Sequence, residues 1–272
     1  MIIDAHQHFW RLDRGDYGWL TPELAPIFRD FGPRDLAPHL TRHGIGGTVL
    51  VQAAPTLAET EYLLELARET DFVRGVVGWV DFEAAGAPEE IARLARHPKL
   101  VGLRPMIQDI AEDDWMLNPS LAPAFEAMIR HDLTFDALVL PRHLPRLREL
   151  LARHLELRCV IDHGAKPEIA RGHFDDWAEQ MTALAQETTA CCKLSGLLTE
   201  AGAGAGHPEV APYAEHLFAQ FSPSRLIWGS DWPVLTLAAS YGAWFEMAMS
   251  FISDAQDRQA VFGGNAMALY RL

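Results

Sequence analysis

Two histidines stand two residues apart in the opening MIIDAHQH, at His6 and His8, with Asp4 two residues before them. Successive side chains of a β-strand point to opposite faces, so residues two apart share a face. We therefore predict that Asp4, His6 and His8 point the same way, with the histidines at the end of a short strand. Imidazole and carboxylate groups gathered at a strand end can bind a divalent metal or move protons.

Other polar residues occupy matching places in later apolar runs. RCVIDHG reaches His163, RLIWGSD reaches Asp231, LVGLRP carries Arg104 and ACCKLSG carries Lys193. Buried polar groups are costly unless they are paired or used. Agreement among several strand ends therefore predicts one shared site. Lys193 is expected either to pair with a carboxylate such as Asp4 or to serve the site directly.

The residue types at these ends suit one divalent transition metal. His6, His8 and Asp231 are the predicted metal ligands, and Zn²⁺ or Mn²⁺ are the ions that imidazole and carboxylate groups bind readily. Asp231 is also the candidate general base that takes a proton from water. His163 is the second candidate catalytic residue.

Eight strand-like runs alternate with segments of helical periodicity. Strands that alternate with helices indicate a parallel sheet, and eight such units in about 250 residues are typical of a closed barrel. We predict an α/β fold, a (β/α)₈ TIM barrel, as a single domain over residues 1–272. An open doubly wound sheet is the alternative, but no G-x-G-x-x-G motif follows the first strand. The strand-like runs cover residues 2–8, 48–54, 73–82, 100–105, 133–140, 158–164, 190–196 and 225–231.

The connecting segments are expected to form helices and two long loops. Helices are predicted over 59–70, 88–97, 145–154, 175–188 and 255–270, and the Gly/Ala-rich stretch 201–206 is predicted to be a flexible loop. The long loops, 9–33 and 106–118, follow the first and fourth strands, at the barrel face where active sites are built. Their aromatic residues favour a lid or pocket wall, with plain packing over the barrel mouth as the alternative; they are Trp10, Tyr17, Trp19 and Trp115.

Composition excludes several classes of partner. The 272 residues carry a formal net charge of −14 without a Lys/Arg-rich run, which argues against nucleic acid and anionic membranes. No run of about 18 apolar residues occurs, so no membrane span is predicted, and no signal peptide is recognised. The cysteines Cys159, Cys191 and Cys192 lie in apolar runs and predict reduced core thiols in a cytoplasmic protein.

The H-x-H after the first strand, the histidine after the sixth and the aspartate after the eighth resemble the amidohydrolase superfamily. The stretches IDAHQHFW, GVVGWVDF, VGLRP, VIDHGAKP, KLSGL, WGSDWPV and GGNAMALY resemble its amidohydrolase-2 branch more narrowly. That branch includes sugar-acid lactonases, a sulfomuconolactone hydrolase and the pyrone-dicarboxylate lactonase. The resemblance spans the whole chain and implies a carboxylic-ester hydrolase.

The chain departs from the binuclear members of that superfamily. Those members carry a bridging Lys or Glu after strand four and a His after strand five. Here Arg104 and Pro105 end the fourth run, and His143 lies beyond Pro141, where it is expected to begin a helix. The resemblance therefore implies at most one divalent metal, Zn²⁺ or Mn²⁺, weakly held or absent.

The resulting hypothesis is a lactonase acting on a small-molecule sugar-acid lactone of the L-fuconolactone or L-rhamnonolactone type. Asp231 would deprotonate water, and a cation, a metal at His6 and His8, or His163 would meet the developing oxyanion. Arg104 and Lys166 are predicted to bind polar groups of the substrate. The alternatives for these two are a structural ion pair and a loop cap.

Two tryptophans, Trp19 and Trp232, are predicted to stack on the sugar ring, with core packing as the alternative. Asn265 is expected to cap the last helix or bind backbone. The alternative function is a non-oxidative decarboxylase of the same superfamily. A metal-dependent amidase is disfavoured by the missing second metal site, and a barrel that only binds a sugar acid is disfavoured by the complete set of histidines and Asp231.

Overall fold

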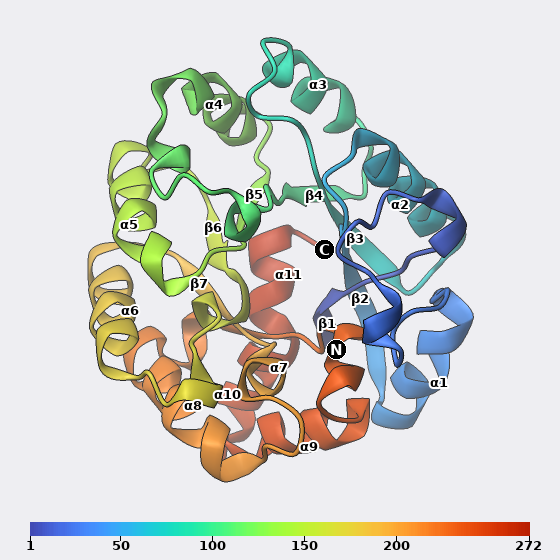
Figure 1. Cartoon of the computed structure of the whole chain (residues 1–272), viewed down its shortest axis with the longest axis vertical. Coiled ribbons are helices and arrows are strands. Elements are labelled where there is room, and N and C mark those ends of the chain that lie inside the picture. The colour runs from blue at the N-terminus through green and yellow to red at the C-terminus, as the bar shows by residue number, and fades with distance from the viewer.

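The eight predicted strands form one closed parallel sheet. The computed structural model describes residues 1–272, and the strands pair in the order β1 to β8 (Figure 1). The N–H of His8 donates to the carbonyl of Trp232 over 2.8 Å, and the N–H of Asp231 donates to the carbonyl of His6 over 2.8 Å. These two bonds join the first strand to the last, so the predicted (β/α)₈ barrel is confirmed. The strands are β1 Ile2–Gln7, β2 Ile45–Val51, β3 Val73–Gly78, β4 Leu100–Leu103, β5 Thr134–Ala137, β6 Cys159–Ile161, β7 Cys191–Leu194 and β8 Leu226–Trp228.

Helices follow the strands and cover the outside of the sheet. Most of them bury an apolar stripe; in α5, for example, Leu144, Leu147, Leu150 and Leu151 are buried. The short α10 buries no residue. Ala201, the first residue of the predicted loop 201–206, is the last residue of the short α7, and the other loop residues join α7 to α8. The helices are α1 Pro33–His43, α2 Leu57–Glu69, α3 Ala87–Leu94, α4 Ala122–Arg130, α5 Leu144–Arg153, α6 Asp175–Glu187, α7 Leu197–Ala201, α8 His207–Phe221, α9 Tyr241–Ser250, α10 Ala255–Gln259 and α11 Asn265–Tyr270.

The predicted helix over 255–270 is broken in the structure. A π-helical turn, Ala260–Gly264, separates α10 from α11, and Gly263 leaves the helical conformation. A Cβ on Gly263 would lie 2.1 Å from the carbonyl oxygen of Met1, so the backbone approaches β1 too closely for a side chain. The side-chain amide of Asn265 donates to the carbonyls of Pro223 and Leu226 over 2.7 Å each, which ties α11 to β8. Asn265 thus binds backbone, as predicted.

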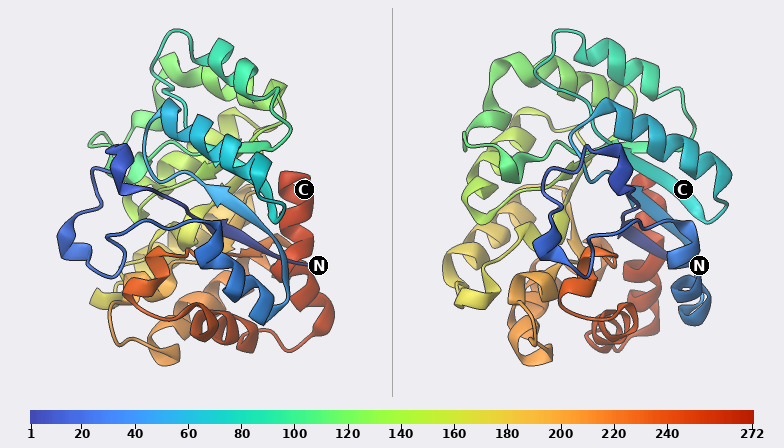
Figure 2. Two further views of the ribbon diagram at one scale, coloured as in Figure 1. Left: turned by 90° about the vertical axis from the view of Figure 1, so that its right-hand side faces the viewer. Right: turned by 45° about the vertical axis from the view of Figure 1, so that its right-hand side comes forward.

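One end of the barrel is closed by α11. Ile3, Val49, Val77, Val160 and Ile227 come from five different strands and pack together with two residues of α11, so this cluster fills the barrel interior; the two are Ala266 and Tyr270. Figure 2 shows α11 on one side of the molecule and the long segment after β1 on the other. The open end, where the site forms, is therefore the end covered by that long segment.

The expected alternation fails within β1. Ile3 and Ala5 belong to the interior cluster, whereas Asp4 accepts a hydrogen bond of 2.9 Å from the hydroxyl of Tyr241 in α9. In a regular strand, Ala5 and His6 would face opposite sides. The pairing of β1 with β2 shifts register between Asp4 and Gln7, so both Ala5 and His6 face inward. The prediction that Asp4 shares a face with the two histidines is wrong for this reason.

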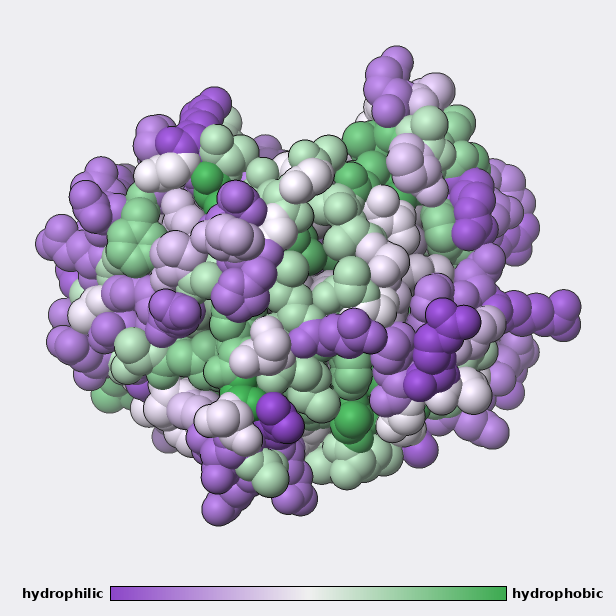
Figure 3. Space-filling view, turned by 90° about the horizontal axis from the view of Figure 1, so that it is seen from below, coloured by the Kyte–Doolittle hydropathy of each residue, from purple (hydrophilic) through white to green (hydrophobic).

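The surface is mainly polar. Four large apolar side chains are exposed, those of Met1, Trp19, Phe28 and Leu155. Seen from below, hydrophilic residues form the outer margin of the molecule and apolar residues lie toward the middle (Figure 3). No helix is both long enough and apolar enough to cross a membrane. All three cysteines are free thiols.

Candidate active site

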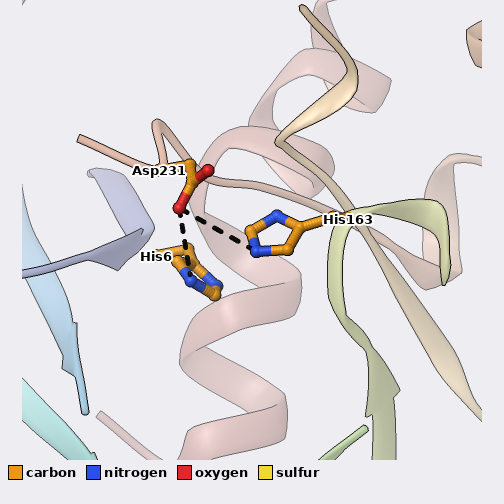
Figure 4. A group of neighbouring side chains, drawn as sticks. All are labelled: His6, His163 and Asp231. Carbon is orange, nitrogen blue, oxygen red and sulfur yellow. Dashed lines mark ion pairs between the residues drawn. The ribbon is translucent and has the colours of Figure 1, made fainter. Parts of the chain in front are cut away.

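His6, His8, His163 and Asp231 meet at the open end of the barrel. One carboxylate oxygen of Asp231, Oδ1, lies 3.7 Å from Nε2 of His6 and 3.9 Å from Nε2 of His163 (Figure 4). The same oxygen lies 3.2 Å from Nε2 of His8. The Nε2 atoms of His6 and His8 are 3.2 Å apart. All four side chains are buried. The structure thus brings together the histidines and the aspartate that the sequence placed at the ends of strands one, six and eight.

Left-handed backbone conformations aim these side chains. His163, Gly164, Ala165 and Lys166 all have positive φ, between 52° and 62°, and Asp231 has φ of 58°. L-residues adopt this region rarely, and such conformations gather at functional sites. Strand β6 ends at Ile161, so the residues after it no longer alternate between two faces. Asp162 therefore faces the barrel interior, and the next residue, His163, faces the cavity. Strand alternation alone would have turned Asp162 outward, which is why the sequence did not reveal it.

A buried ionic network lies directly beneath the histidines. Nζ of Lys193 is 2.5 Å from Oδ2 of Asp136, 2.9 Å from Oδ1 of Asp162 and 3.1 Å from Nδ1 of His6. The hydroxyl of Tyr270 donates to the same Asp136 oxygen over 2.6 Å. Lys193 therefore pairs with Asp136 and Asp162, and the predicted pairing with Asp4 is wrong, because Asp4 points to the helix layer.

The charges of this network fix its protonation. Burial alone would lower the pKa of the Lys193 ammonium, but Asp136 and Asp162 raise it above its usual range. Burial likewise opposes ionisation of Asp162, yet Lys193 and His6 hold the pKa of that carboxyl well below its usual range. Lys193 and Asp162 are thus an ion pair at neutral pH.

Arg104 joins the network to the cavity. Its Nη1 donates to Oδ2 of Asp162 over 3.2 Å and lies 3.3 Å from Nε2 of His6, and its Nη2 donates to the carbonyl of Gln52. Arg104 also lines the cavity described below. Both readings of Arg104 from the sequence, the structural ion pair and the contribution to a substrate site, are therefore compatible with its position.

Asp231 is an anion beside the neutral imidazoles of His6 and His163. Burial opposes ionisation of Asp231, but His163 and the hydrogen bond from His8 hold the pKa of its carboxyl below the usual range. Burial lowers the pKa of His163 to about 4, and burial with the nearby Lys193 lowers the pKa of His6 well below its usual range. At neutral pH, Asp231 is thus a carboxylate able to accept a proton. His163 and His6 offer hydrogen bonds without charge.

The donor set fits one divalent ion. Donor atoms of His6, His163 and Asp231 lie within 4.8 Å of one another, and His8 contacts the same Asp231 oxygen. Nitrogen and carboxylate oxygen donors suit Zn²⁺ or Mn²⁺. The cationic groups of Arg104 and Lys193, 3.3 Å and 3.1 Å from the two ring nitrogens of His6, reduce the affinity for a further cation.

A cavity of about 190 Å³, the reaction cavity, opens above these residues. Nζ of Lys166 lies 3.0 Å from Oε1 of Gln108 and 3.3 Å from Oε1 of Glu200. Gln108 and Glu200 come from loop and short-helix segments without a readable periodicity, so the sequence did not single them out. The lining includes His8, Arg104, His163 and Asp231 at its base and Trp19, Lys166, Gln108 and Glu200 around its sides.

The two tryptophans predicted to stack on a sugar differ in position. Trp19 lines the reaction cavity, and its indole N–H donates to the carbonyl of Ala53 over 2.7 Å. Trp232 is buried among Phe9 and Phe31, with ring centroids 6.2 Å and 5.2 Å away. The structure therefore does not bring Trp232 to the cavity, because its side chain faces the aromatic layer behind the strand end.

Comparison with known proteins places this geometry in a family. The model of the family described as amidohydrolase matches residues 3–272. The chain belongs to the amidohydrolase family. It is 50% identical to an L-fucono-1,5-lactonase of Burkholderia ambifaria, with 99% of this chain and 95% of the relative covered. It is 36% identical to an L-fucono-1,5-lactonase of Burkholderia multivorans, with 99% and 96% covered.

A solved amidohydrolase structure from Burkholderia multivorans, with bound zinc, has the same architecture. Its TM-score is 0.93 at 35% identity, and the match covers 100% of this chain and 99% of that one. The amidohydrolase resemblance read from the strand-end motifs is thereby confirmed.

Proposed function

We propose that this amidohydrolase opens the 1,5-lactone ring of a sugar acid by hydrolysis, with L-fucono-1,5-lactone as the expected substrate. The observation that carries the proposal is the 50% identity to an L-fucono-1,5-lactonase over nearly the full length of both chains. The site is compatible with it, because the ionised Asp231 borders a reaction cavity of about 190 Å³. Cavities for drug-sized ligands span roughly 300–1,000 Å³, so this one suits a single small ring.

In the proposed reaction, Asp231 accepts a proton from water, and the water oxygen attacks the lactone carbonyl. The carbonyl oxygen gains negative charge, which the guanidinium of Arg104 and a hydrogen bond from His163 stabilise. The ring C–O bond then breaks, and the departing oxygen takes the proton held by Asp231. The product is the open-chain hydroxy acid. Because a low pKa makes Asp231 a weak base, stabilisation of the oxyanion carries much of the rate.

A divalent metal would be held by His6, His163 and Asp231, with His8 alongside. When bound, it would polarise the lactone carbonyl as a Lewis acid. The related Burkholderia multivorans structure contains bound zinc, which supports the binding of a metal by this chain. The expectation for this chain is one divalent metal, Zn²⁺ or Mn²⁺, weakly held or absent.

Lys166 and Glu200 are proposed to bind the ring hydroxyls, because their paired side chains leave a donor and an acceptor facing the cavity. Trp19 is proposed to pack on a face of the ring. A cytoplasmic location remains a prediction, which the free thiols of Cys159, Cys191 and Cys192 support.

The deciding experiment is a pH-indicator assay of the purified protein over L-fucono-1,5-lactone, L-rhamnono-1,5-lactone and D-glucono-1,5-lactone, with and without a chelator. Hydrolysis of L-fucono-1,5-lactone is the expected result. Loss of activity with chelator and its return with Zn²⁺ or Mn²⁺ would make the metal essential. Hydrolysis of none of the three lactones, with release of CO₂ from an aromatic carboxylic acid, would replace the lactonase by the decarboxylase alternative.

A further inference from the structure

A second cavity adjoins the reaction cavity and has no part in the reaction proposed above. Its volume is about 570 Å³, and Trp19, Met106 and Asp109 line both cavities. The other aromatic walls are Trp79, Phe82 and Trp115. We call this second space the aromatic cavity. Because the two cavities share a wall, this wall decides whether part of a substrate bound in the reaction cavity can extend into the aromatic cavity.

The two cavities differ in charge. The reaction cavity holds the cationic side chains of Arg104 and Lys166 together with carboxylates, those of Asp109, Glu200 and Asp231. The aromatic cavity has no basic residue in its lining, and its polar residues are carboxylates: Asp16, Asp81, Glu83 and Asp109. The carboxylates of the aromatic cavity disfavour an anionic group there, whereas its rings would accept an uncharged aromatic or apolar group.

The indole of Trp19 is held firmly in this shared wall. Its N–H donates to the carbonyl of Ala53 over 2.7 Å, and its ring meets the ring of Trp10 edge-on, with centroids 5.5 Å apart. Trp10 is fully buried and donates to the carbonyl of Arg29 over 2.8 Å. The N–H of Ala53 is in turn bonded to the buried carboxyl of Glu59 over 3.0 Å. Moving the indole aside would thus break contacts on two sides.

We propose that Trp19 is the specificity-determining residue that limits the substrate to a single lactone ring without bulky substituents, by closing the reaction cavity against the aromatic cavity. The inference rests on the proposed lactonase function. Removal of the indole joins the two cavities and admits lactones that carry an uncharged aromatic substituent. Trp19 therefore excludes lactones with a bulky aromatic substituent, in addition to its contact with the lactone ring.

The test compares wild type with Trp19→Ala on four substrates: L-fucono-1,5-lactone and its 2-O-, 3-O- and 4-O-benzyl ethers. The three ethers present the benzyl group in three directions from the same ring. The readout is the ratio of kcat/KM for each ether to kcat/KM for the parent lactone. We expect this ratio to rise at least tenfold for one or more ethers in Trp19→Ala. Trp19→Phe, which keeps an aromatic wall, is expected to retain the wild-type ratios.

The location is tested by adding Trp79→Ala to Trp19→Ala. If the increase in the kcat/KM ratio for an ether is smaller in the double variant than in Trp19→Ala, the benzyl group lies in the aromatic cavity. An equal increase in both variants overturns that placement. Unchanged ratios for all three ethers in a folded Trp19→Ala variant would overturn the size limit while leaving the lactonase function intact. No hydrolysis of the parent lactone by wild type would overturn the lactonase function itself. Thermal melts check folding, and Trp19→Leu substitutes if Trp19→Ala does not fold.

Discussion

The residue on which the site converges is Asp231. Its Oδ1 is the common neighbour of three imidazoles, and its low pKa keeps it ionised throughout the neutral range. Among the carboxylates that line the reaction cavity, Asp231 is buried and follows the end of a strand. We therefore propose that Asp231 carries the proton transfer, and the exposed Asp109 at the rim is the natural comparison.

Asp231→Asn should abolish most lactone hydrolysis, because an amide cannot accept the proton from water. General-base catalysis contributes on the order of 100- to 10,000-fold, so kcat should fall at least about 100-fold. The measurement is the initial rate on L-fucono-1,5-lactone, with a thermal melt to show that the fold is kept. Asp109→Asn, at the same cavity but away from the histidines, should stay within about fivefold of wild type. Near-wild-type activity in Asp231→Asn would contradict the assignment.

Ser195 orients a catalytic candidate without bordering the reaction cavity. Its Oγ lies 2.8 Å from Nδ1 of His163, and the side chain is fully buried. Ser195→Ala removes this partner and frees the imidazole to rotate, so kcat should fall roughly tenfold with KM little changed. Steady-state kinetics separate the two parameters. A change confined to KM would show that Ser195 affects binding of the lactone instead of the orientation of His163.

At the scale of single residues, strand alternation predicted the direction of some side chains correctly and of others wrongly. It correctly gathered His6, His8 and Asp231, because polar residues at strand ends of a barrel meet at one face. It misplaced Asp4, because a register shift in β1 reverses the alternation between Asp4 and Gln7. It missed Asp162, since four consecutive left-handed residues replace the strand there. Such departures arise from tertiary packing and leave no periodic signal.

Among the elements, the junction of β2 and α2 supports the reaction cavity from behind. The carboxyl of Glu59 accepts hydrogen bonds from the N–H groups of Ala53, at 3.0 Å, and Ala54, at 2.7 Å. Burial raises the pKa of Glu59 to about 7, although these N–H groups counteract the rise; Tyr17 and Asp16 face it from the segment after β1. A buried carboxyl that titrates near neutrality makes this junction sensitive to pH.

Stability should therefore depend on pH through Glu59. The pKa of about 7 in the folded state exceeds the ordinary value of 4.5, so the folded protein binds this proton more tightly than the unfolded chain does. The stabilisation is complete below pH 4.5 and is lost as pH rises through about 7, a loss on the order of 3 kcal/mol. Glu59→Gln should remove this part of the pH dependence of the free energy of unfolding, measured by urea titration between pH 4.5 and 8.

Glu61→Gln, an exposed position on the same helix, is the control and should leave the pH profile of wild type. An identical profile for wild type and Glu59→Gln would show that the carboxyl of Glu59 titrates at the same pH in both states, contrary to the effect of its burial.

Elements with a strong period were predicted more accurately than those without one. The spacing of Leu and Ala residues predicted α2 and α5, and the alternation of apolar runs with helical segments predicted the barrel. The segments 9–33 and 106–118 were recognised only as long, and their short 3₁₀ turns were not predicted. The break in 255–270 arises where Gly263 packs against Met1, a contact between residues far apart in the sequence.

Across the whole molecule, one polar network runs from the floor of the barrel to the site. Tyr270 of α11 contacts Asp136 of β5, Asp136 pairs with Lys193 of β7, and Lys193 reaches His6 of β1. All of these groups are fully or almost fully buried. A buried ion pair adds little net stability, but removal of one partner leaves uncompensated charge in the interior.

Lys193→Met should accordingly destabilise the fold by about 3–5 kcal/mol, because Asp136 and Asp162 lose their shared cation. Urea unfolding measures the change. Adding Asp136→Asn should recover part of the loss, since one of the two stranded carboxylates is then neutral. A Lys193→Met protein as stable as wild type, or a double variant less stable than the single one, would show that the network contributes differently.

The closure between β1 and β8 also governs when the enzyme can first work during its own synthesis. His6 precedes Asp231 by 225 residues in the sequence (231 − 6), yet the two side chains lie 3.7 Å apart. A nascent chain on the ribosome therefore carries its histidines long before it carries their carboxylate. The barrel stays an open sheet with an unpaired edge until β8 emerges. Chains that end before β8 should therefore be inactive on L-fucono-1,5-lactone, because they lack Asp231.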